Sequence, residues 1–209
     1  ADFANKVTER HNIVHGTTLQ NCYSCSDSDT SDVTCTEVMN HPNQCSGYVL
    51  PTEGEWEYAA RSGTQFNYWT PGGGGNTSSS ATCGNNTVND TTITINDGVT
   101  NPPLSSYAWF CGNQYDTTYN DTAKPVALKL PNGFGLFDMH GNVQEWTSDW
   151  MGCSLVGTDP YCSSNNTSQC VRRGGSWATD VLGSGASFRQ TAALGFPGYM
   201  FGFRLGLHR

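Results

Sequence analysis

The nine cysteines of this 209-residue chain restrict its fold more than any other feature. They fall into three groups, namely Cys22, Cys25, Cys35 and Cys45 near the start, Cys83 and Cys111 in the middle, and Cys153, Cys162 and Cys170 towards the end. A disulfide that closes a loop contributes about 2–4 kcal/mol of stability. We therefore expect disulfides to staple long loops, with at least one thiol free or paired elsewhere because the number is odd.

The spacing of Cys22 and Cys25 leaves a second interpretation open. A Cys-x-x-Cys pair can start a zinc site, which Cys35 and Cys45 would complete. Disulfides are the favoured interpretation because loops of this kind need closure. They form in oxidising compartments, so we expect an extracellular or surface-displayed protein.

The composition predicts an ordered, loop-rich domain. Charged residues make up 13% of the chain, about half the usual share of ~25%. With 36% hydrophobic and 11% aromatic residues the chain has apolar area to bury, while 24 glycines favour turns and irregular loops. Neither an internal repeat nor a linker divides the sequence. We expect one domain over residues 1–209 with an irregular α+β fold.

The net charge of −8 argues against a nucleic-acid or anionic-membrane surface, because either needs a cluster of Lys and Arg. Membrane insertion is not expected, since no apolar run approaches the ~20 residues that a spanning helix needs. Residues 2–7 (DFANKV) read as a short helix already under way. A mature secreted form or a trimmed chain would both begin in this manner.

The clearest predicted helix covers residues 52–61. Thr52 can cap its start, and Glu55 three residues later completes a capping box. Trp56, Ala59 and Ala60 share one face at the spacing of a buried stripe, and Gly63 is expected to end the helix. Residues 91–95 (TTITI) alternate like a short strand, and residues 132–150 are expected to enter a second ordered core.

Three motifs resemble one protein family. They are residues 50–61 (LPTEGEWEYAAR), residues 135–150 (GLFDMHGNVQEWTSDW), and residues 173–177 (RGGSW) followed by residues 202–205 (GFRL). In this order they resemble the formylglycine-generating-enzyme, or sulfatase-modifying-factor, family over about residues 48–205. The resemblance implies a C-type lectin-like fold of that subtype, with little regular secondary structure.

The same resemblance implies a metal site. In the family a calcium ion is held by a stretch that matches Asp138, Gly141, Val143 and Glu145. Two carboxylates and backbone carbonyls are the hard oxygen ligands that calcium takes. The alternative is that Glu145 only hydrogen-bonds backbone amides in a loop.

The catalytic residues of the family are missing from the matching segment. Its enzymes use a copper-binding cysteine pair shortly after the Gly-Gly-Ser motif, and the matching positions here are Thr179 and Ser184. A hydroxyl cannot replace a thiolate as a soft copper ligand. No cysteine follows Cys170, so we expect neither copper nor formylglycine formation.

Residues 178–201 are nearly uncharged and mix small with aromatic side chains. Gly195, Pro197 and Gly198 interrupt regular structure, so we expect the aromatic residues on a loop, although they could instead fill the core. Exposed aromatic side chains on a rigid scaffold supply contact area for a partner at low entropic cost.

This arrangement resembles the variable proteins of diversity-generating retroelements, which end soon after Gly-Phe-Arg-Leu. The resemblance implies diversified, ligand-binding positions within residues 178–201, of which Gln190 and Met200 fit adenine-directed change less well. The positions are Ala178, Thr179, Asp180, Gly183, Ser184, Phe188, Gln190, Thr191, Ala192, Ala193, Gly195, Phe196, Gly198, Tyr199, Met200 and Phe201.

Three functions follow from the sequence. The favoured one is a non-catalytic protein that binds proteins or cell-surface structures of varying identity. The others are a formylglycine-generating-type oxidase with relocated chemistry and a binding module of fixed specificity on the same fold.

Overall fold

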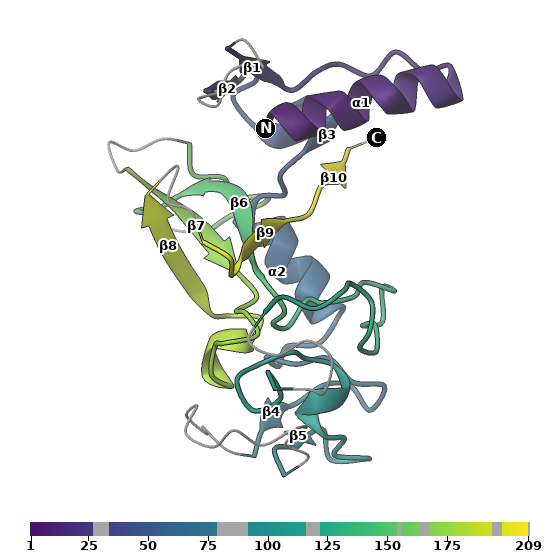
Figure 1. Cartoon of the computed structure of the whole chain (residues 1–209), viewed down its shortest axis with the longest axis vertical. Helices are drawn as coiled ribbons and strands as arrows, with labels where there is room; N and C mark the ends of the chain where they lie inside the picture. The colour runs from purple at the N-terminus through teal and green to yellow at the C-terminus, as the bar shows by residue number, and fades with distance from the viewer. Residues whose placement is uncertain are drawn as a thin grey trace.

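The computed structural model describes residues 1–26, 34–78, 92–115, 122–153, 156–163, 168–193 and 198–208. Within these residues the chain is loop-rich, as expected, with short elements (Figure 1). The helices are α1 (Asp2–His15) and α2 (Glu53–Arg61), and the 3-10 turns are η1 (Pro42–Gln44), η2 (Leu104–Ser106) and η3 (Leu182–Ser184). The strands are β1 (Tyr23–Cys25), β2 (Cys35–Glu37), β3 (Tyr48–Val49), β4 (Asn76–Thr77), β5 (Ile95–Asn96), β6 (Gln144–Trp150), β7 (Gln169–Arg173), β8 (Arg189–Ala193), β9 (Phe201–Phe203) and β10 (Gly206–Leu207).

A four-stranded sheet in the order β8-β7-β6-β9 forms the centre of the fold. The pairs β8/β7 and β7/β6 are antiparallel, whereas β9 runs parallel to β6. Strand β10 pairs with β3 and joins the end of the chain to its N-terminal part. Both termini therefore lie at one end of the molecule, while β4 and β5 lie at the other (Figure 1).

Helix α2 forms where the sequence predicts it. The Thr52 side chain accepts a hydrogen bond from the backbone N–H of Glu55, whose carboxylate accepts one from the backbone N–H of Thr52. Trp56 and Ala60 are buried, and Ala59 is half-buried. The expected end at Gly63 is one residue late, because Ser62 already takes the left-handed conformation with φ 47°.

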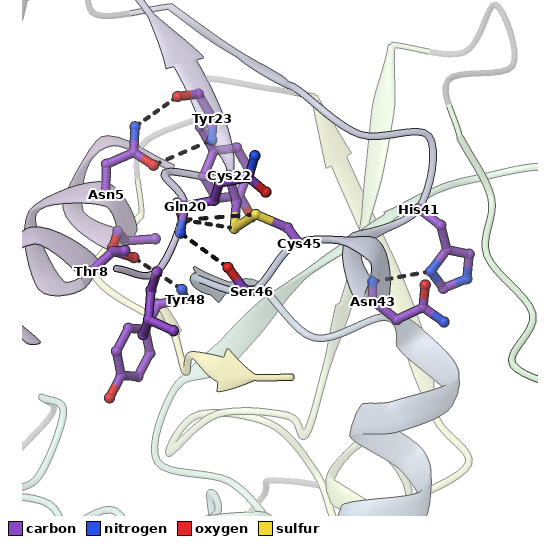
Figure 2. Close-up of a disulfide and its surroundings, with 12 residues drawn as sticks. Asn5, Thr8, Gln20, Cys22, Tyr23, His41, Asn43, Cys45, Ser46 and Tyr48 are labelled. Carbon is purple, nitrogen blue, oxygen red and sulfur yellow. Dashed lines mark hydrogen bonds between the residues drawn. A yellow bond between two sulfur atoms is a disulfide. The ribbon is translucent and has the colours of Figure 1, made fainter. Parts of the chain in front are cut away.

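Two nested disulfides hold the N-terminal part together. Cys22–Cys45 encloses Cys25–Cys35, which joins β1 to β2. Figure 2 shows the outer bond beside α1, where Asn5 exchanges hydrogen bonds with the backbone of Tyr23 at 2.7 and 3.2 Å. The zinc alternative for these four cysteines is wrong, because each sulfur is used in a disulfide.

The other cysteines agree with the expectation of disulfides plus an odd thiol. Cys153 pairs with Cys162, and Cys170 is a buried free cysteine. Cys111 is disulfide-bonded, and Cys83 lies outside the described residues. No helix in the described part of the chain is long and apolar enough to cross a membrane.

The largest buried cluster holds the start of the C-terminal segment. Ile95, Leu104 and Phe110 lie at its centre, and Val181 packs into it from residues 178–184. The strand expected at residues 91–95 is shorter and later than predicted. The described strand is Ile95–Asn96, Thr94 forms only a bridge to Pro103, and Thr91 lies outside the described residues.

Candidate binding surface

Two glycines set the path of the chain into the C-terminal segment. Gly174 and Gly175 have φ values of 89° and 69°, which side chains rarely adopt. A Cβ on Gly175 would lie 2.6 Å from the carbonyl oxygen of Gly183, and one on Gly174 would lie 2.9 Å from the ring of Trp56. The turn after β7 therefore needs glycine at both positions.

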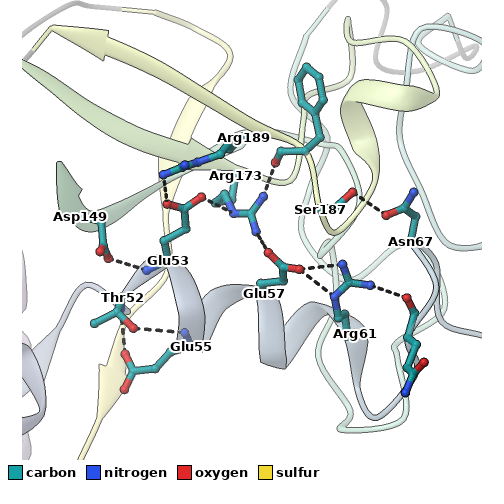
Figure 3. Close-up of polar contacts among 12 residues, drawn as sticks. Thr52, Glu53, Glu55, Glu57, Arg61, Asn67, Asp149, Arg173, Ser187 and Arg189 are labelled. Atoms are coloured by element: carbon teal, nitrogen blue, oxygen red, sulfur yellow. Dashed lines mark hydrogen bonds and ion pairs between the residues drawn. The ribbon is translucent and has the colours of Figure 1, made fainter. Parts of the chain in front are cut away.

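A buried ionic cluster fixes the same turn to α2, as Figure 3 shows. The guanidinium of Arg173 lies against Glu53, at 3.3 Å, and against Glu57, and it donates to the carbonyl of Phe188 at 2.5 Å. Arg189 donates to Glu53 at 2.5 Å. Arg173 and Glu53 are 1% and 0% exposed, so neither charge has water to solvate it. The pairing replaces that solvation and holds β7 and β8 on the helix.

The C-terminal flank of residues 178–201 is also fixed by an ion pair. Arg204, just after β9, donates to both carboxylate oxygens of Glu145, at 2.5 and 2.7 Å. The indole N–H of Trp56 donates to the same carboxylate at 2.6 Å. Both flanks of residues 178–201 are thus tied to one helix and one strand.

Thr179 and Ser184 make hydrogen bonds that define the backbone. Thr179 accepts from the backbone N–H of Ser176 at 2.9 Å, and the hydroxyl of Ser184 donates to the carbonyl of Asp180 at 3.1 Å. Ser184 is fully buried, and a Cβ on Gly183 would lie 2.3 Å from the Thr179 methyl. Gly183 and Ser184 shape this turn and are not placed to touch a ligand, contrary to the prediction for them.

The remaining predicted positions reach solvent to different degrees. Tyr199 is 76% exposed and Phe188 37%. Ala193 is exposed too, and Gly195 and Phe196 lie outside the described residues. The half-buried positions are Ala178, Thr179, Asp180, Gln190, Thr191, Ala192, Gly198, Met200 and Phe201.

Several of these positions lie on strands, whereas a loop was expected for the aromatic ones. Phe201 opens β9, and Gln190 lies on the edge strand β8. The side-chain amide of Gln144 donates to Gln190 at 2.5 Å across the sheet. Because Gln144 is opposite Phe201 in the register, all three share one face. The predicted surface therefore follows an open sheet face as well as a loop.

Sequence reasoning missed the fixed residues on that face. Arg172 lies 3.9 Å from the ring centroid of Phe201 and 5.3 Å from that of Trp146. Its Nη2 donates to the carbonyl of Thr191 at 2.9 Å, while Nε and Nη1 have no hydrogen-bond partner within the described part of the chain. Exposed Leu182 was also left out of the predicted set. The two-residue alternation of Gln144 and Trp146 is the signal that could have identified the face.

A second aromatic group borders the surface near Tyr199. The rings of Trp177 and Tyr199 are 6.0 Å apart, and Lys124 Nζ lies 5.6 Å from the centroid of Trp177. Trp177 is buried and belongs to the fixed flank, whereas Tyr199 projects from it. A fixed ring thus supports an exposed one.

Of the four residues expected to hold calcium, Asp138 and Glu145 would supply carboxylates, and both carboxylates have protein partners in this conformation. The carboxylate of Glu145 forms an ion pair with Arg204 and accepts a hydrogen bond from the indole N–H of Trp56. Asp138 accepts from the backbone N–H of Ala127 at 2.8 Å, and its other oxygen is buried with no hydrogen-bond partner among the described residues. At Gly141 and Val143 calcium would bind the backbone carbonyl oxygens, whereas the Gly141 N–H donates to the carbonyl of Gly174. The described residues contain no cluster of three or more metal-binding side chains.

Calcium at these residues stays a prediction that thermal unfolding can test. If calcium binds there, EDTA should lower the melting temperature and added Ca²⁺ should restore it. An unchanged melting temperature would contradict the prediction.

His140 is expected to make the stability of the fold depend on pH. Its ring is buried 4.9 Å from that of Tyr68, and its Nδ1–H donates to the carbonyl of Ser184 at 2.9 Å. Burial lowers the pKa of His140 from 6.5 to about 4. The neutral imidazole is therefore the form that supports the turn at Ser184.

We expect stability to fall as the pH drops from 6.5 towards 4, because the unfolded chain gains a proton at His140 that the folded chain does not. The effect of this residue is up to about 1.4 kcal/mol for each pH unit. Asp149 acts in the opposite direction, since burial raises its pKa to about 6. Urea unfolding of wild type and His140→Phe at pH 7, 6 and 5 separates the two, because Asp149 is common to both. Parallel pH profiles would contradict the role of His140.

A family model described as "Sulfatase-modifying factor enzyme 1-like domain" matches residues 4–208. Among solved structures, Treponema denticola variable protein 1 aligns with a TM-score of 0.68 at 25% identity, over 99% of this chain and 67% of that protein.

Curated proteins are also similar to this chain in sequence. The formylglycine-generating enzyme of Mus musculus is 32% identical over 134 residues, which are 63% of this chain and 31% of that enzyme. A protein named chaperone protein LppX, from Paenibacillus barcinonensis, is 29% identical over 153 residues, or 73% of this chain and 44% of that protein. The chain therefore spans less than half the length of these relatives.

Proposed function

Because the chain belongs to the sulfatase-modifying factor enzyme 1-like family and has its loop-rich, C-type lectin-like fold, we propose that it is a non-catalytic binding protein. Its C-terminal surface would be diversified by a retroelement to recognise varying targets. The ligands would be proteins or cell-surface structures outside the producing cell.

The observation that carries this proposal is the contrast between the segment and its flanks. Arg173 fixes one end through a buried ion pair and Arg204 the other through a half-buried one, while Tyr199 and Ala193 between them are exposed. A surface of this kind can change its side chains without disturbing the core. Thr179, which replaces one reactive cysteine, is engaged by backbone and offers no metal-binding thiolate.

Two further findings support the proposal. The structural similarity to a variable protein from Treponema denticola covers 99% of this chain. The disulfides indicate an oxidising compartment, which suits a protein that meets partners outside the cell.

Diversification predicts a specific pattern of tolerance. We expect Tyr199→Ser and Ala193→Tyr to change the free energy of unfolding by no more than about 0.5 kcal/mol, because both positions are exposed. Gly175→Ala is the control from the fixed flank. It should destabilise by about 1–3 kcal/mol, since φ is 69° and the new Cβ would clash with backbone. Equal losses at all three positions in urea unfolding would contradict a tolerant surface.

Two observations test the rest of the proposal. The gene should have a nearby near-copy of its 3′ end that differs mainly at adenines, beside a reverse transcriptase. Without that arrangement the chain would be a binding module of fixed specificity. Copper(I) titration and incubation with a cysteine-containing peptide test the enzyme alternative. Stoichiometric copper binding with conversion of the cysteine would overturn the non-catalytic assignment.

A further inference from the structure

A cavity of about 840 Å³ lies between the disulfide-stapled N-terminal part and one face of the sheet. Tyr23 and Glu37 line it from the β1–β2 hairpin, and Trp146, Trp150 and Cys170 line it from β6 and β7. Its size falls within the ~300–1,000 Å³ range typical of sites for small molecules. None of the described C-terminal positions predicted to bind ligands lines it.

Aromatic side chains supply much of the cavity wall. The indoles of Trp146 and Trp150 come from the sheet, and the phenol rings of Tyr23 and Tyr161 come from other segments. Faces of such rings attract cations through their quadrupole, and Trp does so best. Trp146 already has one cation beside it in the fold, because Arg172 lies 5.3 Å from its centroid.

The charge of the wall complements a cation. Glu37 is the carboxylate among the described lining residues, which include no Lys, Arg or His side chain. Ala1 also lines the cavity, and burial lowers the pKa of its α-amino group, which favours the neutral amine. The hydroxyl of Tyr161 donates to Glu37 and orients its carboxylate.

We infer that this cavity binds a small organic cation, with a substituted ammonium group against Glu37 and the Trp faces and an apolar body inside the cavity. The cavity shares Trp146 and one sheet face with the C-terminal surface, but none of the described predicted positions lines it, so the inference goes beyond the function proposed above. It can fail without affecting that proposal, and the reverse also holds.

Choline and its neutral isostere 3,3-dimethylbutan-1-ol test the inference, because they share shape and differ in charge. We expect isothermal titration calorimetry of the full chain to show choline binding roughly tenfold more tightly than the alcohol. Glu37→Gln should weaken choline binding about 3- to 30-fold. Glu9 is an exposed residue of α1 outside the cavity. Glu9→Gln removes the same charge and should leave choline binding unchanged.

Cys170 reports where the cation binds. Burial raises the pKa of this free thiol to about 11, so its alkylation is slow and can be followed at pH 9 by peptide mass spectrometry. Choline should slow the alkylation severalfold, and the neutral alcohol should not. Three outcomes would overturn the inference: no choline binding at millimolar concentration, equal binding of both compounds, or choline binding that leaves Cys170 alkylation unchanged.

Discussion

Replacing Arg173 with Met is expected to lower the free energy of unfolding by about 3–5 kcal/mol, as found when one partner of a buried ion pair is removed. Arg173 is 1% exposed, and Glu53 beneath it is 0% exposed. The substitution leaves Glu53 buried with Arg189 as its remaining cation and removes the donor to the Phe188 carbonyl. Urea unfolding monitored by tryptophan fluorescence measures the loss.

Lys6→Met is the matched control, because it removes a cation from the surface pair Lys6–Asp2, in which Lys6 is 57% exposed. We expect it to cost no more than about 1 kcal/mol. The double variant Glu53→Gln with Arg173→Met should be less destabilised than the sum of the single variants, since neither member of the buried Arg173–Glu53 pair then remains charged without the other. An Arg173→Met loss equal to that of Lys6→Met would refute the structural role of the cluster.

Removing the disulfide between Cys22 and Cys45 by changing both to Ala is expected to cost about 3 kcal/mol. The bond closes a loop with a sequence separation of 23, and its constraint on the unfolded chain scales with the logarithm of that length. Both cysteines are also buried against Ala4 and Val49, so the change leaves a small void.

The inner disulfide provides the comparison. Changing Cys25 and Cys35 to Ala should cost less, because the separation is 10 and the outer bond still restrains the ends. Thermal unfolding of the two double variants shows which disulfide contributes more to stability. If the inner bond matters more, the stability of this part resides in the β1–β2 hairpin and not in its attachment to α1 (Figure 2).

Local signals predicted local structure well. The capping box of Thr52 and Glu55 involves residues three apart, so the sequence alone could specify it. Disulfides were expected from the number and grouping of cysteines, but the pairing of Cys22 with Cys45 depends on how the chain returns past α1. The loop-rich character followed from the glycine content, because glycine favours turns locally.

Long-range pairing could not be read from the sequence. Glu145 was expected to bind calcium because its motif resembles a metal-binding stretch. Its pairing with Arg204, 59 residues later, arises only when β9 lies beside β6. Ser184 was assigned to the binding surface by its position in the chain, yet the turn at η3 buries it. Spacing along an irregular segment carries no information about which side faces solvent.

The parallel pairing of β9 with β6 limits how the C-terminal segment can change over time. Phe201 is opposite Gln144, and a slip of one residue would move Phe201 to the face occupied by Trp56 and Glu145. The same slip would take Arg204 out of reach of its carboxylate. Substitution of one side chain by another is therefore compatible with this architecture. An insertion or deletion of one residue between β8 and β9 would have to be compensated before Phe201 to keep the register of β9 with β6. This sheet therefore favours substitutions that keep the length of the C-terminal segment over insertions and deletions.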